Sequence, residues 1–175
     1  MRTLPPPTTT GHVQWIGVRP ERGAPMRALN EVEAVATVGL RGDRYHSTRD
    51  GKRQVTLIQG EHLPALGAFL GRGPVAPERT RRNLVIEGVN LLALKHHRIA
   101  IGEAVVLEYS GLCAPCGKMD RDDRLGPGGF AAMRGHGGIT ARILVGGVIR
   151  VGDPVRALLD DIPTDPPPQL SILDD

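Results

Sequence analysis

The sequence ITARILVGGVIRVGDPV, residues 139–155, holds two runs rich in β-branched residues on either side of a glycine pair. The first run spans residues 139–145, the second spans residues 148–155, and Gly146-Gly147 separates them. Two such runs joined by two glycines are typical of a tight hairpin, because glycine readily adopts the positive φ angles of a primed turn. We therefore predict two adjacent antiparallel strands here.

Comparable patterns recur over most of the chain. Further short β-rich runs are found at residues 12–18, 54–58, 83–86 and 98–109. Apolar residues at helical spacing predict helices only at residues 61–70 and 130–134. Many short strands with few helices favour a mostly β fold, a closed or nearly closed β-barrel with a few short helices, since closure removes exposed sheet edges.

The composition supports this fold class. The 175 residues suit one domain, and 23 glycines, 15 prolines and 3% aromatic residues argue against a bundle of long helices. We predict a flexible N-terminal tail at residues 1–10, a barrel domain at residues 11–157 and a Pro- and Asp-rich tail at residues 158–175. No apolar run approaches the roughly 20 residues that span a bilayer, and two cysteines make no disulfide scaffold, so we expect a cytoplasmic protein without a membrane segment.

The charge is unevenly distributed along the chain. Residues 158–175 contain five acidic residues and no basic one, whereas residues 1–157 contain 22 basic and 14 acidic residues. This surplus indicates an anionic partner. Nucleic acid is disfavoured as that partner, because none of the five aromatic residues is interleaved with the basic ones.

The motif Cys113-Ala114-Pro115-Cys116 has several chemical interpretations. A thioredoxin-like redox pair would need a βαβ unit, and a zinc site would need more ligands at zinc-binding spacing; neither is evident. The remaining interpretations are a single functional thiolate, which binds a thiophilic metal or carries sulfur, and two small buried cysteines without a chemical role.

Two basic segments are candidates for anion binding. Arg79-Thr80-Arg81-Arg82-Asn83 places three arginines in four residues before a predicted strand, where guanidinium groups can bind a phosphate in a forked manner. The loop at residues 39–46, GLRGDRYH, has glycines that can direct Arg44 and His46 into a pocket. The alternatives are a solvated basic turn and a surface loop with an internal Asp–Arg ion pair.

Taken in order, these segments resemble the MOSC domain, named for the C-terminal domain of molybdenum cofactor sulfurases. The resemblance covers residues 11–155, and no single piece of it is specific alone. Its pieces are GLRGDRYH at 39–46, RQVTLI at 53–58, RNLVIEGV at 82–89, IGEA at 101–104, CAPC at 113–116 and GGVIRVGD at 146–153.

The resemblance implies a β-barrel that binds the molybdenum cofactor, a pterin with a phosphate and a dithiolene-bound metal. The family's functional thiol, which ligates molybdenum or carries sulfur, corresponds to Cys116. The residues around the cofactor correspond to Arg44, Arg81, Arg82 and Asn83, with His46 as a further candidate. No pyridoxal phosphate is expected in this chain, and electron-donor or sulfur-donor proteins are the implied partners. A related activity is reduction of N-hydroxylated compounds; the alternative is a non-catalytic barrel that binds an anion or a partner.

Overall fold

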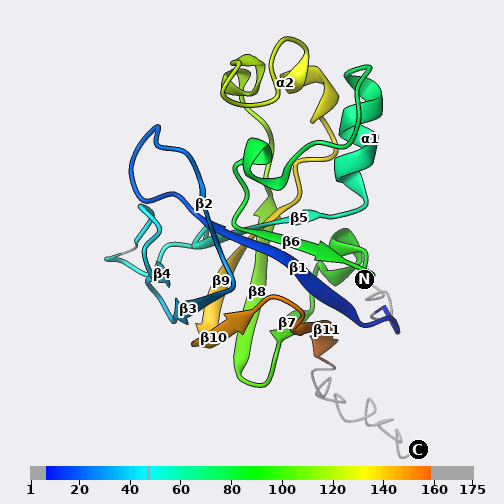
Figure 1. The fold of residues 1–175 in the computed structure, drawn as a ribbon. Helices are drawn as coiled ribbons and strands as arrows, with labels where there is room; N and C mark the ends of the chain where they lie inside the picture. The colour runs from blue at the N-terminus through cyan, green and yellow to red at the C-terminus, as the bar shows by residue number, and fades with distance from the viewer. Residues whose placement is uncertain (1–6, 47, 159–175) are drawn as a thin grey trace, which may run out of the picture.

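The computed structural model describes residues 7–46 and 48–158, and its main feature is a closed seven-stranded β-barrel (Figure 1). Each strand pairs with the next around the ring, and the last pairs back with the first. The order is β1 (Gly11–Val18), β6 (Leu84–Glu87), β5 (Val55–Gln59), β9 (Ile139–Val145), β8 (Val105–Leu112), β7 (Arg98–Ile101) and β11 (Pro154–Leu158). All of these pairs are antiparallel except β5 with β6. The predicted mostly β barrel is therefore confirmed.

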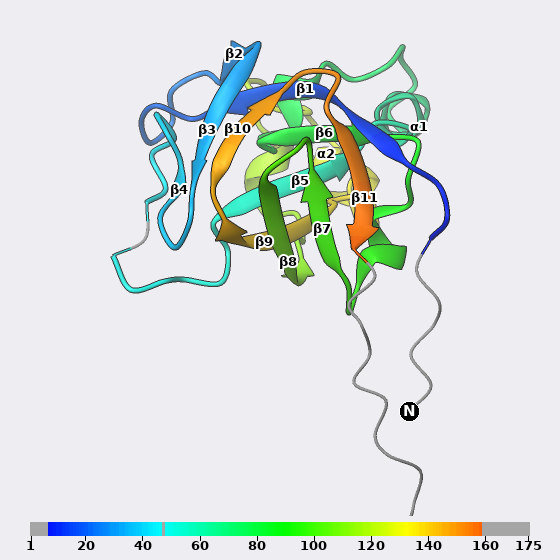
Figure 2. The same cartoon turned by 90° about the horizontal axis from the view of Figure 1, so that it is seen from below.

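Four further strands extend the barrel. β2 (Arg27–Leu29) pairs with β1, and a second sheet has the order β10–β3–β4 (Figure 2). The strands of this second sheet are β3 (Glu31–Val35), β4 (Gly39–Leu40) and β10 (Gly147–Arg150). This sheet sets the course of the chain that leads into the loop at residues 41–46.

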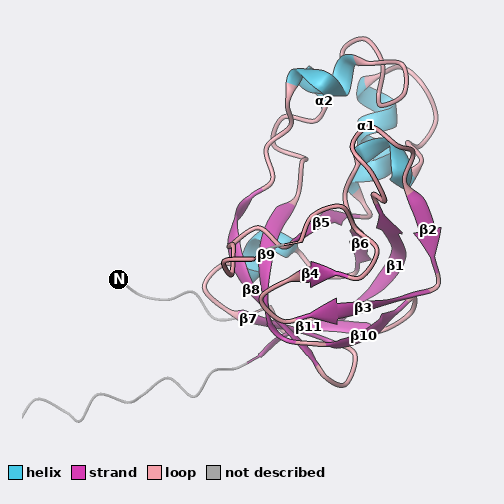
Figure 3. Cartoon of the chain, turned by 90° about the vertical axis from the view of Figure 1, so that its left-hand side faces the viewer, coloured by secondary structure: helices cyan, strands magenta, loops and turns pink. Residues whose placement is uncertain are grey.

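The helices gather at one end of the barrel (Figure 3). α1 (His62–Phe69) and α2 (Gly129–Ala132) confirm the two helices predicted from the sequence. Three 3-10 turns complete the connections: η1 (Pro77–Thr80), η2 (Leu91–Leu94) and η3 (Gly117–Asp120). Much of the candidate site comes from loops at this end.

The predicted hairpin at residues 139–155 is wrong. β9 pairs with β5 and β8, whereas β10 pairs with β3 in the other sheet. The glycine pair carries the chain between sheets, and a Cβ on Gly146 would lie 2.7 Å from the carbonyl oxygen of Ala34. The predicted second strand is also divided into β10 and β11 by a turn at residues 151–153. Periodicity identified extended segments but contained no information about their partners.

The apolar core has two parts. The larger one fills the barrel and includes fully buried Ile16, Leu57 and Leu107. The smaller one packs the helices against the barrel and includes Leu66 and Met133. Burying a side chain of this size contributes about 1.5–3 kcal/mol to the stability of the fold. The larger part therefore stabilises the barrel, and the smaller part stabilises the packing of the helices on it.

We predict that Gly138→Ala destabilises the fold much more than Gly135→Ala. Both glycines have positive φ angles, +81° and +79°, so alanine is strained at either position by about 1 kcal/mol. A Cβ at residue 138 would also lie 2.0 Å from the carbonyl oxygen of Leu57, whereas one at residue 135 meets nothing within 4 Å. Chemical denaturation should show an additional loss of about 2 kcal/mol or more for Gly138→Ala. Equal losses in the two variants would contradict the close approach.

Candidate functional site

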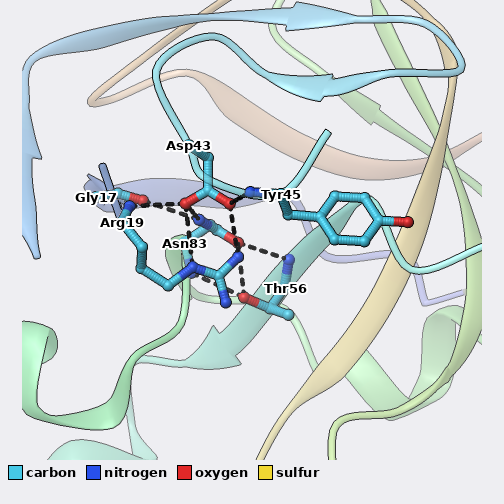
Figure 4. A network of polar contacts seen from close by, with 6 residues as sticks. All are labelled: Gly17, Arg19, Asp43, Tyr45, Thr56 and Asn83. Carbon is cyan, nitrogen blue, oxygen red and sulfur yellow. Dashed lines mark hydrogen bonds and ion pairs between the residues drawn. The ribbon is translucent and has the colours of Figure 1, made fainter. Parts of the chain in front are cut away.

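Asp43 lies in the loop after β4 and binds Arg19, which follows β1 (Figure 4). Arg19 donates from its backbone N and Nε to Asp43 Oδ1 at 2.7 and 3.0 Å, and from Nη2 to Oδ2 at 2.7 Å. The backbone N of Tyr45 donates to Oδ2 at 3.1 Å. Asp43 therefore pairs with an arginine outside the loop, and not within it as in the alternative interpretation of this segment. Arg41, which is in the loop, pairs with Glu33. A long-range ion pair ties the loop to the barrel.

The Asn83 side chain forms hydrogen bonds with both members of this ion pair. Its Oδ1 accepts hydrogen bonds from the backbone N and Oγ1 of Thr56 and from Arg19 Nη2, and its Nδ2 donates to Gly17 O and Asp43 Oδ1. The residue is fully buried. Because its amide is fully engaged within the protein, Asn83 positions the ion pair rather than offering a free group to a ligand.

The environment of Asp43 favours its ionised form. Burial alone would raise the pKa of Asp43. The hydrogen bonds and charge of Arg19, with the backbone N–H groups of Arg19 and Tyr45, outweigh burial and hold this pKa below its usual value of 3.8.

Five arginines from separate segments form one cationic group, here named the arginine cluster: Arg19, Arg44, Arg81, Arg82 and Arg124. Arg81 interacts electrostatically with Arg124, Arg19 and Arg44, and Arg82 interacts with Arg19. Among the described residues, two carboxylates act on the cluster, those of Asp43 and Asp123. The cluster therefore has an excess of positive charge.

Arg81 shows the effect of this crowding most clearly. Burial, followed by the positive charges of Arg124 and Arg19, lowers the pKa of Arg81 to about 10, although Asp123 acts in the opposite direction. A bound anion would relieve this repulsion. The residue ends η1 in the left-handed region, at φ +61°.

Arg124 is nine-tenths buried, and its Nε has no hydrogen-bond partner among the described residues. The Asp123 carboxylate lies 3.4 Å away, which gives an ion pair but not a hydrogen bond. A buried N–H without a partner is costly, so this group is suited to an external acceptor.

Arg82 is 6% exposed and connects three segments of the backbone. Its Nε donates to Gly137 O at 2.7 Å, its Nη1 to Thr80 O at 3.0 Å and its Nη2 to Cys113 O at 2.9 Å. Three of the five guanidinium N–H groups are used in this way. Much of the hydrogen-bonding capacity of Arg82 therefore serves the protein itself.

The two cysteines lie beside Arg82. Cys113 is half-buried after β8, and Cys116 is exposed immediately before η3. Burial lowers the pKa of Arg82, whereas negative charge on the Cys113 and Cys116 sulfurs acts in the opposite direction. Arg82 therefore links the arginine cluster to the cysteine segment, through its hydrogen bond to the Cys113 carbonyl and through electrostatics.

The predicted site residues are thus largely brought together. Arg44, Arg81 and Arg82 belong to the cluster, and Asn83 supports it from the core. His46 is exposed and, within the part of the chain that the structure describes, makes no hydrogen bond or ion pair with the cluster. Its role stays a prediction.

A cavity of about 900 Å³ adjoins Cys113 at the helical end of the barrel. Cys113 and Gly137, two of the three residues whose carbonyls accept from Arg82, line it together with His62 and His136. The site therefore has two compartments, a cationic one and a cavity, with Cys113 at the boundary between them.

Comparison with known protein families gives a match to the MOSC domain over residues 40–156, well over half of the chain. The chain belongs to the MOSC domain family. The match includes both basic segments and both cysteines, but Arg19 lies before it.

Solved structures share the fold of this chain. The YUAD protein from Bacillus subtilis has a TM-score of 0.71 at 17% identity, and the alignment covers 86% of this chain and 97% of that one. YiiM from Geobacillus stearothermophilus has a TM-score of 0.64 at 16% identity, with 87% and 77% covered. YiiM from Escherichia coli has a TM-score of 0.63 at 17% identity, with 85% and 70% covered. A comparison with curated proteins finds no match.

Sequence reasoning missed several residues of this MOSC site. Arg19 directly follows the predicted strand at residues 12–18, and Arg124 ends an alternating run of charges; neither position marks a ligand site by itself. His62 and His136 lie 74 positions apart in the sequence, and only the fold brings them together, with ring centroids 4.6 Å apart.

Two broader findings constrain the MOSC chain. The described residues hold no group of three or more His, Cys, Asp or Glu side chains that could bind a metal ion. Of the helices in residues 7–46 and 48–158, none has the length and apolar character needed to cross a bilayer.

We predict that Asp43→Asn lowers the free energy of unfolding by about 2–4 kcal/mol at pH 7, because Arg19 loses its buried carboxylate partner. The lowered pKa of Asp43 means that its stabilisation is complete above pH 3.8 and disappears as pH falls through the folded-state pKa. The difference in free energy of unfolding between wild type and Asp43→Asn should accordingly become smaller below pH 3.8. Urea denaturation as a function of pH measures it.

The matched control for this prediction is Glu33→Gln, which removes the exposed partner of Arg41. An exposed pair contributes less than about 1 kcal/mol, so this variant should stay close to wild type. If the free energies of unfolding of wild type and Asp43→Asn differ by the same amount at every pH, the ion-pair explanation is contradicted.

Proposed function

We propose that this protein binds the molybdenum cofactor, with the anionic phosphate at the arginine cluster and the metal facing Cys116. The observation that carries the proposal is that Arg82, a member of the arginine cluster, donates a hydrogen bond to the Cys113 carbonyl and interacts electrostatically with both cysteines. Membership of the MOSC family supports the choice of this cofactor over other anions.

The residues present fit the phosphate of such a group. Arg124 offers a buried Nε without a partner, and the pKa of Arg81, lowered to about 10 by burial and neighbouring arginines, indicates uncompensated positive charge. Arg44 is exposed beside them and can add a third guanidinium group. Forked, charge-assisted hydrogen bonds from these three residues would fix the phosphate.

The thiols fit the metal end of the cofactor. The bound cofactor supplies a redox-active metal held by a dithiolene. Cys116 is exposed at the start of η3, so its sulfur is accessible to that metal, and a thiolate is a ligand that thiophilic metals prefer.

With Cys116 as a permanent metal ligand, the protein would be an oxidoreductase that reduces N-hydroxylated compounds with electrons from a partner protein. In the second role, Cys116 carries a sulfur atom: its thiolate takes the terminal sulfur of a donor persulfide, and the donor thiolate leaves. An exposed thiol is compatible with either partner. The cytoplasmic location stays a prediction from cysteine usage.

The two roles of Cys116 are separated by its replacement. We expect protein purified from a host that makes the cofactor to contain stoichiometric molybdenum by mass spectrometry, lost in Cys116→Ala and retained in Cys113→Ala. Metal-free wild type with cyanide-releasable sulfur, absent from Cys116→Ala, would instead identify the sulfur carrier. Unchanged cofactor affinity in Cys116→Ala, together with no cyanide-releasable sulfur in wild type, would contradict both roles and favour a non-catalytic anion-binding barrel.

We also predict that Arg124→Gln lowers cofactor occupancy about tenfold or more, because a buried charge-assisted hydrogen bond contributes about 1.5–3 kcal/mol. Pterin content per chain, measured by fluorescence after oxidation, checks this. Arg121→Gln is the matched control, since Arg121 also pairs with Asp123 but its side chain is 63% exposed. Equal losses in the two variants would show that overall charge, and not the buried Nε, attracts the cofactor.

A further inference from the structure

The cavity of about 900 Å³ is distinct from the arginine cluster. Its walls come from the start of α1, from the segments at residues 88–92 and 112–115, and from the loop at residues 134–138. Volumes of this size are typical of small-molecule sites, which combine apolar walls with a few polar groups. The polar groups therefore indicate which ligand the cavity suits.

Two polar side chains of the wall are already engaged within the protein. Gln59 donates to Glu61 Oε2 at 2.7 Å and to Val89 O at 3.0 Å, and its Oε1 accepts from the backbone N of Leu91. Glu61 accepts a second hydrogen bond from the backbone N of Gly88 at 2.8 Å. These groups build the wall and leave ligand recognition to other residues.

His62 and His136 are not engaged in this way. Their rings meet edge to face, at an interplanar angle of 89°, and Nδ1 of each is buried without a hydrogen-bond partner among the described residues. Burial, followed by the charge of the His136 ring, lowers the pKa of His62 and favours its neutral form, although the His136 backbone and Glu61 act in the opposite direction. In a neutral imidazole one nitrogen carries the proton, and a buried N–H without a partner is costlier than a buried lone pair. We therefore assign the proton to Nε2.

The rest of the cavity is largely apolar and open at a hydrophobic rim. Leu92, Leu112 and Phe130 line it while remaining 48%, 63% and 38% exposed. The wall carries one carboxylate, that of Glu61, and one exposed guanidinium group, that of Arg134, so its charges favour neither an anion nor a cation. The cavity thus suits an uncharged molecule with an apolar body.

We propose that this cavity binds an uncharged aromatic compound whose carbonyl oxygen accepts hydrogen bonds from Nε2 of His62 and His136. Such a ligand would lie beside Cys113, at the boundary with the cationic compartment. The proposal goes beyond the cofactor site, because its walls and donors belong to the protein alone.

The test uses acetophenone and ethylbenzene, which have nearly the same shape and differ in the carbonyl group. In an apolar pocket without donors, ethylbenzene would bind more tightly, since a carbonyl loses hydration on burial. We expect acetophenone to bind the full-length protein at least fivefold more tightly, measured by NMR titration of the imidazole signals. It should also slow alkylation of Cys113 in Cys116→Ala, and benzoate should bind more weakly than acetophenone.

Substitution of the histidines completes the test. In His136→Phe the preference for acetophenone should fall below twofold, whereas His136→Gln, which keeps a donor, should retain part of it. His12→Phe, at an exposed strand position outside the cavity, should behave as wild type. Equal binding of the two probes to wild type would overturn the proposal, and so would a preference that survives in His136→Phe. The wild-type titration does not depend on the folding of any variant.

Discussion

A guanidinium group buried without a carboxylate partner among the described residues organises the helical end of this barrel. Arg82 donates to the backbone carbonyls of Thr80, Gly137 and Cys113, which belong to three segments distant in sequence. Removing a charge from water is expensive, and three carbonyl dipoles only partly replace the lost hydration. The position of the thiols, the course of the loop before β9 and the wall of the cavity all depend on this contact.

Around Arg82, some polar side chains have all their hydrogen bonds within the protein, and these support the fold. Others have a buried polar atom without a hydrogen-bond partner, and these are available for ligands. Asn83 is fully engaged, and Arg19 and Asp43 satisfy each other. Among the described residues, Nε of Arg124 and the Nδ1 atoms of His62 and His136 have no hydrogen-bond partner. Because buried polar groups in proteins are almost always paired, the unpaired ones mark positions where the fold alone does not satisfy the chain.

The sequence predicted the barrel, both helices and most of the cationic residues, because these depend on local patterns: alternation, helical spacing and arginines close together in the chain. It failed where the outcome depends on partners. The glycine pair at residues 146–147 connects two sheets rather than closing a hairpin, and its sequence is compatible with either. Arg19 and Arg124 join the cluster only through the closure of the barrel, and the approach of His62 to His136 has the same origin. The expected place of Asn83 beside a ligand stays a prediction; its register beside Thr56 on a parallel strand places its amide in the core, which no local pattern indicates.

The two compartments share Arg82 and Cys113 but differ in the residues that touch only one of them. Arg82 braces the cavity through Gly137 and Cys113 and interacts electrostatically with both thiols, so its replacement would disturb the cationic site and the cavity together. Arg124 belongs to the cluster alone, and His136 lines the cavity without contacting the cluster. Effects of substitutions at positions without shared partners are usually additive, whereas those within one hydrogen-bonded network are not. Separate chemistry at the two compartments can therefore be assigned only through residues such as Arg124 and His136, and a loss of function in an Arg82 variant would be uninformative about which compartment failed.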